Sequence, residues 1–131
     1  MISKARRMKR IVVPEIMLVL AKYGVNGKVK SVNHNIVYVE IKAGKINFTL
    51  DKYGCTRVTE DEFLSTKNDP DCYTNEPELE RRFLTELYDA MNARNTVLSI
   101  AEQYELDTYK NEDIKVEVRI GKWPVPYQLV A

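Results

Sequence analysis

The sequence predicts an α+β domain, in which an antiparallel sheet carries helices packed on one of its faces. Two observations predict this class. Strand-like segments follow one another in the first half of the chain, and another lies near its end. Between them, apolar residues recur every three or four positions, as they do in an amphipathic helix. A length of 131 residues is that of a single domain.

We expect that domain to lie between two arms. Residues 1–13 are predicted to be a basic N-terminal arm, residues 14–122 the domain, and residues 123–131 a C-terminal arm. The C-terminal arm combines proline with aromatic side chains. The apolar fraction of 44% and the charged fraction of 30% are those of an ordinary globular protein, so disorder is not expected.

The first helix is expected over residues 14–23. Proline favours the first position of a helix, and Gly24 favours its end. An antiparallel meander then follows, with a tight polar turn at residues 33–35. Its strands are predicted over residues 27–33, 36–42 and 45–51. Alternation places Val37, Val39 and Ile41 on one apolar face of the second strand, and Ile46, Phe48 and Leu50 on one face of the third.

The polar stretch over residues 56–77 is predicted to be a long loop, with one helical turn near Phe63. The cleanest strand of the chain lies over residues 114–120, where Ile and Val alternate with charged residues. It is expected to complete the sheet.

A longer helix is predicted to begin at Asn75, because Glu78 stands three residues later as in a capping box. Its apolar stripe is Leu79, Phe83, Leu87 and Met91. The helix is expected to run to about Arg94. A second helical stretch around residues 97–104 either continues it or follows a break.

Charge is divided unevenly along the chain, although the net charge is only +1. Residues 1–58 contain twelve Lys and Arg against three acids, whereas residues 59–131 contain eight against sixteen. This asymmetry indicates a basic surface that binds an anion, or two surfaces that attract each other. The alternative is that the two halves fold against one another and neutralise their charges locally.

Basic residues of the first half are the candidate contacts to a nucleic acid or to an acidic partner. Phosphate contacts need only mobile cations, and the basic N-terminal arm supplies several. The alternative is that this arm is solvated and binds nothing. The candidates are Lys4, Arg6, Arg7, Lys9, Arg10, Lys22, Lys28 and Lys30.

The C-terminal arm offers a different kind of contact. Its prolines favour an extended backbone, while Trp123, Tyr127 and Leu129 are too apolar to lie free in water. The arm either packs on its own domain or docks on a neighbour, where aromatic anchors dominate interfaces. Trp123, Tyr127 and Leu129 are therefore the candidate protein interface.

The segment Tyr38-Val39-Glu40-Ile41-Lys42 contains the Glu-x-Lys half of a nuclease motif. With the helix and strand predicted before it, it resembles the core of the PD-(D/E)xK nucleases. The resemblance implies that Glu40 would bind a divalent metal, that Lys42 would orient the attacking water, and that Glu15 would be the helix acid. The chain departs from the family because residues 16–39 contain no Asp or Glu.

Mg²⁺ needs more than one carboxylate, so we expect no catalytic residue, no metal site and no cofactor. Glu40 and Lys42 are explained as charged residues on the solvent face of an alternating strand. The single His34 and the widely spaced Cys55 and Cys72 do not form a zinc site. We expect both cysteines to be free thiols.

The sequence favours a non-enzymatic module that binds another protein, or further copies of itself, through surfaces of opposite charge. Such a module would assemble head to tail or clamp onto a larger complex. Small chains of this kind are frequent among virus-encoded accessory and virion components. The alternative is a nucleic-acid-binding protein that uses the basic N-terminal half, and a divergent or inactive nuclease comes third.

The expected location is the cytoplasm, or the host cytoplasm or virion if the protein is viral, without membrane binding. Basic residues precede an apolar stretch at residues 4–21, but Pro14 and Glu15 interrupt it and no cleavage site follows. The run over residues 16–21 is far shorter than the roughly 20 residues that a transmembrane helix needs.

Overall fold

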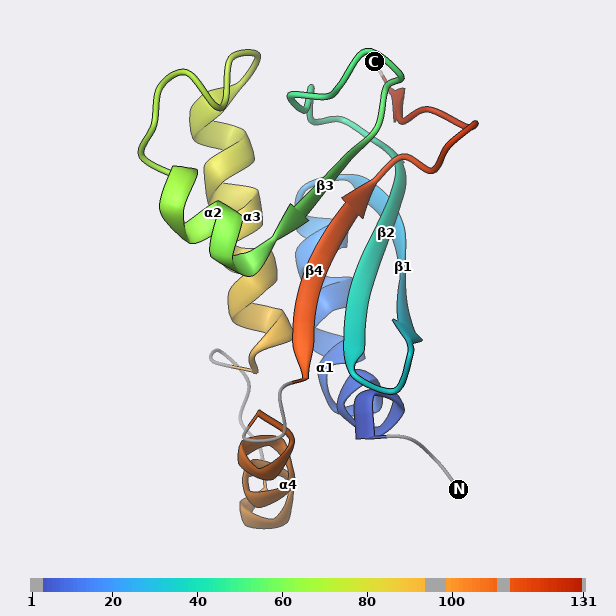
Figure 1. Ribbon diagram of the computed structural model, residues 1–131, viewed down its shortest axis with the longest axis vertical. Helices are drawn as coiled ribbons and strands as arrows, with labels where there is room; N and C mark the ends of the chain where they lie inside the picture. The colour runs from blue at the N-terminus through green and yellow to red at the C-terminus, as the bar shows by residue number, and fades with distance from the viewer. Residues whose placement is uncertain (1–3, 94–98, 111–113, 131) are drawn as a thin grey trace.

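A mixed sheet with helices packed against it forms the fold, which confirms the predicted α+β class (Figure 1). The structure is a computed structural model that describes residues 4–93, 99–110 and 114–130. The helices are α1 (Lys4–Lys22), α2 (Glu60–Thr66), α3 (Pro77–Met91) and α4 (Ile100–Lys110). The strands are β1 (Val25–Val32), β2 (Ile36–Gly44), β3 (Thr56–Thr59), β4 (Lys115–Ile120) and β5 (Gln128–Leu129). In Figure 1, α1 lies behind the sheet, α3 lies to its left and α4 lies below it.

The strands lie in the order β1-β2-β4-β3, and β5 pairs with the end of β2. β1 with β2 and β3 with β4 are antiparallel, whereas β4 and β5 each run parallel to β2. The expectation of a purely antiparallel sheet is therefore wrong at β2. Parallel neighbours need a crossover connection, and the chain from β3 through α2, α3 and α4 provides it between β2 and β4.

The hairpin between β1 and β2 turns where predicted. Asn33 and His34 have positive φ angles of 55° and 63°, which a tight hairpin turn requires. His34 is therefore a turn residue. Its carbonyl accepts a hydrogen bond from the backbone N–H of Ala5 at 3.4 Å, so the turn lies against the start of α1.

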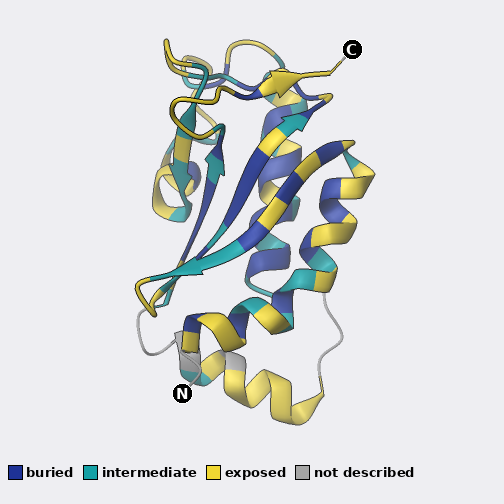
Figure 2. Ribbon diagram, turned by 90° about the vertical axis from the view of Figure 1, so that its right-hand side faces the viewer, coloured by how far each residue is buried: buried dark blue, intermediate teal, exposed yellow. Residues whose placement is uncertain are grey.

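The core lies between the inner face of the sheet and the two long helices. Figure 2 shows buried residues where α1 and α3 face the strands, and mainly exposed residues along α4. Alternate strand positions supply the sheet side of the core: Val25, Val29, Val37, Val39, Ile41, Val116, Val118 and Ile120. The inward positions predicted for β2 and β4 are thus confirmed.

Helix α1 begins at Lys4, not at Pro14 as predicted. Its buried residues form a stripe at helical spacing on both sides of the proline: Ala5, Met8, Val12, Ile16, Val19 and Leu20. Proline removes a hydrogen bond inside a helix, and burial of this stripe offsets that loss. Residues 4–13 are therefore part of a packed helix rather than a separate arm.

Residues 45–51 are not a strand, although Ile46 and Phe48 point into the core as predicted. Polar side chains take the place of a neighbouring strand and satisfy the backbone. The bonds run from Asn47 N–H to Glu76 Oε2 (2.7 Å), from Asn75 Nδ2 to the Phe48 carbonyl (2.9 Å) and from Thr49 N–H to Glu80 Oε1 (2.8 Å). This segment is tied to the start of α3 and not to the sheet.

The stretch over residues 56–77 contains more regular structure than the predicted loop. β3 pairs with β4, and Thr59 caps α2 by accepting a hydrogen bond from the Glu62 N–H at 3.2 Å. Phe63 is the buried residue of α2. The helical turn predicted near Phe63 is part of α2. A strand of four residues is too short to display a period, which is why the sequence pattern missed β3.

Helix α3 has Glu76 as its N-cap, not Asn75 as predicted. Phe83 and Leu87 of the predicted stripe are buried, and Leu79 is partly buried. α3 and α4 are separate helices, and residues 94–98 lie outside the described ranges. Of the helices that the structure describes, none combines the length and the apolar character needed to cross a bilayer.

Candidate functional site

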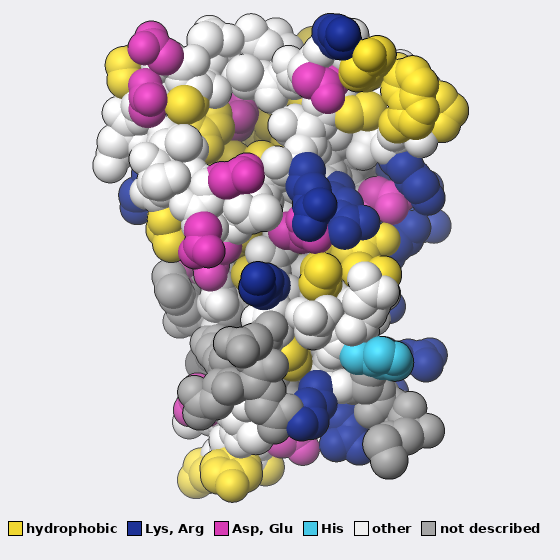
Figure 3. Space-filling view, viewed as in Figure 1, with side chains coloured by type: hydrophobic (Ala, Val, Ile, Leu, Met, Phe, Trp, Pro, Cys, Tyr) yellow, Lys and Arg dark blue, Asp and Glu magenta, His cyan; other side chains and the backbone are white. Residues whose placement is uncertain are grey.

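The face of the sheet that points away from α1 and α3 carries mainly charged side chains. Its residues are the strand positions that alternate with the buried ones. They are Lys28, Lys30, Tyr38, Glu40, Arg57, Thr59, Lys115, Glu117 and Arg119, and we call this surface the open face. Figure 3 views the molecule from this side and shows Lys and Arg side chains gathered over its middle.

Strand pairing arranges these side chains in rows across the sheet. One row is Lys28, Glu40, Arg119 and Arg57, and the next is Lys30, Tyr38, Glu117 and Thr59. Neighbouring strands lie about 4.8 Å apart, so each carboxylate has cations on adjacent strands within reach.

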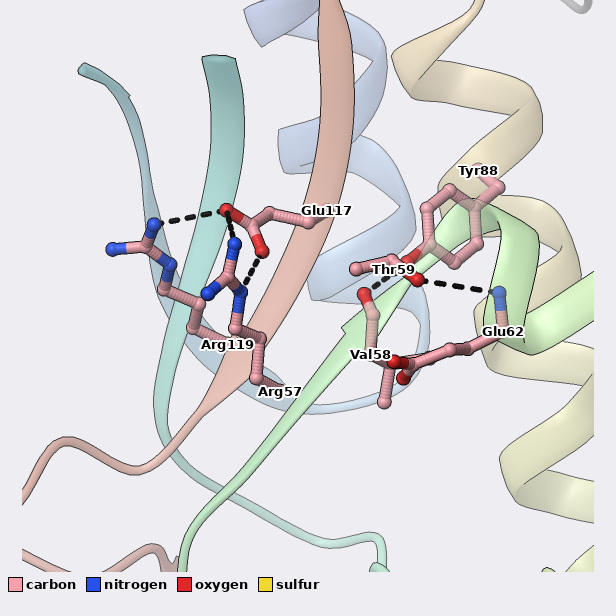
Figure 4. A network of polar contacts seen from close by, with 7 residues as sticks. All are labelled: Arg57, Val58, Thr59, Glu62, Tyr88, Glu117 and Arg119. Carbon is pink, nitrogen blue, oxygen red and sulfur yellow. Dashed lines mark hydrogen bonds and ion pairs between the residues drawn. The ribbon is translucent and has the colours of Figure 1, made fainter. Parts of the chain in front are cut away.

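Glu117 lies between two arginines near the centre of the open face (Figure 4). Its carboxylate accepts hydrogen bonds from Arg57 Nε, from Arg57 Nη2 at 3.2 Å and from Arg119 Nη2 at 2.8 Å. Burial by itself would raise the pKa of Glu117, but the bonds from both guanidinium groups outweigh burial and lower it. Glu117 is therefore an ionised anchor that holds two cations in place.

Glu40 is the second carboxylate of the open face, and it pairs with Lys30 at 3.1 Å. Burial by itself would raise the pKa of Glu40, but Lys30, Lys122 and Lys42 outweigh burial and lower it. We predicted Glu40 on the solvent face of its strand, yet it is only 4% exposed. The groups that lower its pKa are cations, whereas a Mg²⁺ site would surround it with further carboxylates.

Both carboxylates lie beneath the cations that they bind. Glu117 is 3% exposed, whereas the Arg57 side chain is 60% exposed and those of Lys30 and Arg119 are 37% and 31% exposed. A molecule that approaches the open face therefore meets positive charge across three strands, while the compensating negative charge is covered.

Arg119 lies over the ring of Tyr38. Its guanidinium carbon is 3.9 Å from the ring centroid, which is within the range of a cation–π contact. Its Nε is buried and has no hydrogen-bond partner among the residues that the structure describes. The side chain is thus positioned by Glu117 and Tyr38 while one of its donors stays unused.

A cavity of about 430 Å³ opens on the open face, where β3 begins and β4 ends. We call it the Trp123 cavity. Its walls include the cations Arg57, Arg119 and Lys122, the aromatic rings of Tyr38 and Trp123, and the carboxylates of Glu40 and Asp51. Asp51 is fixed because it accepts hydrogen bonds from the backbone N–H groups of Tyr53 and Cys55 at 2.8 Å and 3.0 Å.

Acidic side chains gather beside the open face, on the side of α2 (Figure 3). Glu60 and Asp61 line a smaller cavity of about 180 Å³ between β3, β4 and the start of α2. Ion pairs also join the two halves of the chain, because Arg57 binds Glu117 and Lys22 binds Glu86 at 2.6 Å. The charges of the two halves are thus partly neutralised locally, both at this edge and between α1 and α3.

The predicted basic residues do not form one surface. Lys4, Arg6, Arg7, Lys9 and Arg10 lie on the first half of α1, whereas Lys22 lies at its other end, about 18–27 Å away at 1.5 Å per residue. Lys28 and Lys30 lie on the open face. Arg6, Lys9 and Arg10 share a separate hollow on α1 with Val13 and Pro14.

The C-terminal residues divide between the core and the surface. Tyr127 is buried, its hydroxyl donates to the Ile46 carbonyl at 2.8 Å, and burial raises its pKa to about 12. Trp123 is 68% exposed and contacts Tyr53 edge to face, with ring centroids 4.9 Å apart. Leu129 belongs to β5 and is exposed. Tyr127 is therefore an anchor of this segment, and Trp123 and Leu129 are the residues that can meet a partner.

Replacing Glu117 with Gln is expected to destabilise the fold by about 2 kcal/mol. Removing one partner of a buried ion pair costs about 3–5 kcal/mol, and solvent around the two arginines reduces that cost here. The same change should strengthen binding of an anion to the open face, because the loss of the counter-charge beside Arg57 and Arg119 outweighs the loss of the positioning that Glu117 gives them. Urea denaturation and an anion-binding titration measure the two effects. A variant with lower stability and unchanged anion affinity would contradict the assignment of the site.

Glu40 and Lys42 are the residues that resemble a nuclease metal site in the sequence, but the structure does not gather a set of metal ligands around them in the described ranges. In the described ranges, no three His, Cys, Asp or Glu side chains come together in a way that could hold a metal ion. Cys55 and Cys72 are free thiols, as predicted.

Comparisons with protein-family models, with curated proteins and with solved structures find no match for this chain.

Proposed function

We propose that this protein is a non-enzymatic interaction module, and that its open face binds an anionic macromolecule. The observation that supports this best is the burial of Glu40 and Glu117 beneath Lys30, Arg57 and Arg119. A sheet surface that hides its carboxylates and exposes its cations attracts negative charge.

The open face favours an extended partner over a small one. Lys28 and Arg57 stand at opposite ends of one row across four strands, so they lie about 14 Å apart at the usual strand spacing. A partner that contacts both needs negative charges repeated over that distance. A nucleic acid and an acidic protein segment both meet this requirement, as would the α2 side of a further copy.

The basic half of α1 is a weaker candidate than the open face. In the described part of the chain, the hollow that Arg6, Lys9 and Arg10 share on α1 has only Val13 and Pro14 as its other walls. On the open face, by contrast, Arg57 and Arg119 are positioned by a buried carboxylate, which reduces the entropy lost on binding. Pre-positioned cations thus distinguish the open face as the binding surface.

Reversing the charge of Lys28 tests this function. Lys28→Glu should weaken binding of a labelled polyanion about fivefold at 50 mM salt. It should also reduce the slope of log affinity against log salt concentration by about one, because one phosphate contact is lost. Lys28 is exposed and lies on the edge strand β1, so the fold should tolerate the change. Fluorescence anisotropy at several salt concentrations measures both quantities.

The matched control is Arg82→Glu, which makes the same charge change on an exposed position of α3, outside the open face. The control should bind like the wild type. Equal losses in the two variants would mean that net charge, and not the open face, sets the affinity. Light scattering at low salt serves as a further check, since a mass that grows with protein concentration would identify another copy as the partner.

A further inference from the structure

We propose that the open face binds single-stranded nucleic acid and that the Trp123 cavity receives one of its bases. This inference rests on the proposed function, because it names the class of anion that the open face takes up. It goes beyond that function in assigning an aromatic ligand group to a defined cavity.

Aromatic surface and positive charge occur together in this cavity. Trp123 and Tyr38 line it alongside Arg57, Arg119 and Lys122. Proteins that bind single strands combine a cationic groove for the phosphates with aromatic rings on which bases stack. An acidic peptide would use the cations, but it would leave the Trp123 ring exposed.

Trp123 is exposed in a way that its own domain does not explain. It is 68% exposed, although Tyr127, four residues later, is anchored in the core. Tyr53 contacts Trp123 edge to face, at an interplanar angle of 75°. An indole in contact with a neighbouring ring has fewer orientations to lose when a base stacks on it.

Arg119 provides a second flat group on the cavity wall. Its guanidinium lies over Tyr38 and is bonded to Glu117, so its position is set before any ligand arrives. Guanidinium planes as well as aromatic rings serve as platforms for unstacked bases. Its Nε, which lacks a partner among the described side chains and backbone, is a donor that a ligand oxygen can satisfy after a small shift.

The cavity also has the size and the polar groups that a base needs. Its volume of about 430 Å³ lies within the range of small-molecule sites in proteins. Asp51 on its wall is exposed and is an acceptor for the N–H groups of a base edge. Bases inside a duplex are stacked and paired, so they cannot enter, and the proposal is therefore specific for single strands.

Trp123 is the only tryptophan of the chain, so its fluorescence reports on this cavity alone. The titration uses an oligonucleotide of about twelve thymidines, an abasic oligonucleotide of equal length and an oligoglutamate of equal charge. The thymidine oligonucleotide should quench Trp123 emission, and the other two should bind through charge without quenching. A duplex of equal length should also leave the emission unchanged.

Replacing Trp123 with Ala should weaken binding of the thymidine oligonucleotide about 5- to 100-fold, and binding of the abasic oligonucleotide less than twofold. Val130→Ala is the matched control, because Val130 is exposed in the same C-terminal segment but does not line the cavity. It should bind all ligands like the wild type. Anisotropy of the labelled oligonucleotides measures the affinities, since the variant lacks the intrinsic fluorophore.

Two failures are distinguishable. If the oligoglutamate and abasic strand bind as tightly as the thymidine oligonucleotide, and Trp123→Ala changes nothing, the base site is wrong while the anion-binding function stands. If no polyanion binds at 50 mM salt, the proposed function itself is wrong. Tighter binding of a duplex than of a single strand would also overturn the inference.

Discussion

Replacing Phe48 with Ala is expected to lower the free energy of unfolding by about 3–5 kcal/mol, the usual cost of deleting a buried aromatic side chain. Phe48 is 1% exposed. Its ring lies 5.6 Å from the ring of Phe83 on α3 and 5.1 Å from the ring of Tyr127 in the C-terminal segment. One side chain thus joins α3, residues 45–51 and the residues that follow Trp123. Urea denaturation followed by circular dichroism measures the loss.

Phe48→Leu is the control, because it keeps an apolar side chain in the same place and should cost much less. A loss below about 1 kcal/mol for Phe48→Ala would mean that residues 45–51 do not pack as described. Since Asp51 ends this segment and lines the Trp123 cavity, the Ala variant should also bind single strands less tightly.

Glu80 should make the stability of the fold depend on pH between about 4.5 and 7. The side chain is 2% exposed, and burial raises its pKa to about 7, despite the hydrogen bond from Thr49 N–H. The folded state therefore holds the proton more tightly than the unfolded chain. The resulting stabilisation is complete below pH 4.5 and is lost as the pH rises to 7, a change of about 3 kcal/mol.

Glu80→Gln removes this titration while keeping an oxygen that can accept the Thr49 N–H. The variant should match the wild type near pH 4.5 and exceed its stability by about 3 kcal/mol near pH 8. Denaturation curves of both proteins at these two pH values measure the difference in free energy of unfolding. The other titrating groups contribute equally to both proteins, so they do not affect this difference. A difference that does not change with pH would show that Glu80 is ionised in the folded state.

Much of the fold followed from local patterns. The alternation over residues 36–42 and 114–120 correctly identified the inward faces of β2 and β4, and the Asn-His-Asn turn was correctly placed. The strand predicted over residues 45–51 is wrong. Their alternation is real, but their backbone bonds to side chains of Asn75, Glu76 and Glu80, and alternation alone cannot reveal the bonding partner.

The open face could be predicted only in part. The sequence marks Lys28 and Lys30 as candidates because they are basic, whereas it places Arg57 in a predicted loop and Arg119 in an alternating strand. Strand order decides which of these residues meet, and the parallel pairing of β2 with β4 is a long-range contact that no local pattern contains. The same pairing places Arg119 beside Tyr38 and Glu40.

The charge imbalance along the sequence was an incomplete guide to the surface. Arg57 from the basic half binds Glu117 from the acidic half, and Lys22 binds Glu86 in the same way. These pairs show that local neutralisation accounts for part of the imbalance. The open face is positively charged because its cations are more exposed than the carboxylates that bind them, which are buried.

The most direct test of the account is to map where a polyanion binds by nuclear magnetic resonance. ¹⁵N spectra recorded during titration with a thymidine oligonucleotide should show the largest shifts at Lys28, Arg57 and Arg119, including the Nε signals of the two arginines. Arg82 on α3 should not shift. Shifts centred instead on Arg6 and Arg10 of α1, with the Arg57 and Arg119 signals unmoved, would contradict the open face as the binding surface.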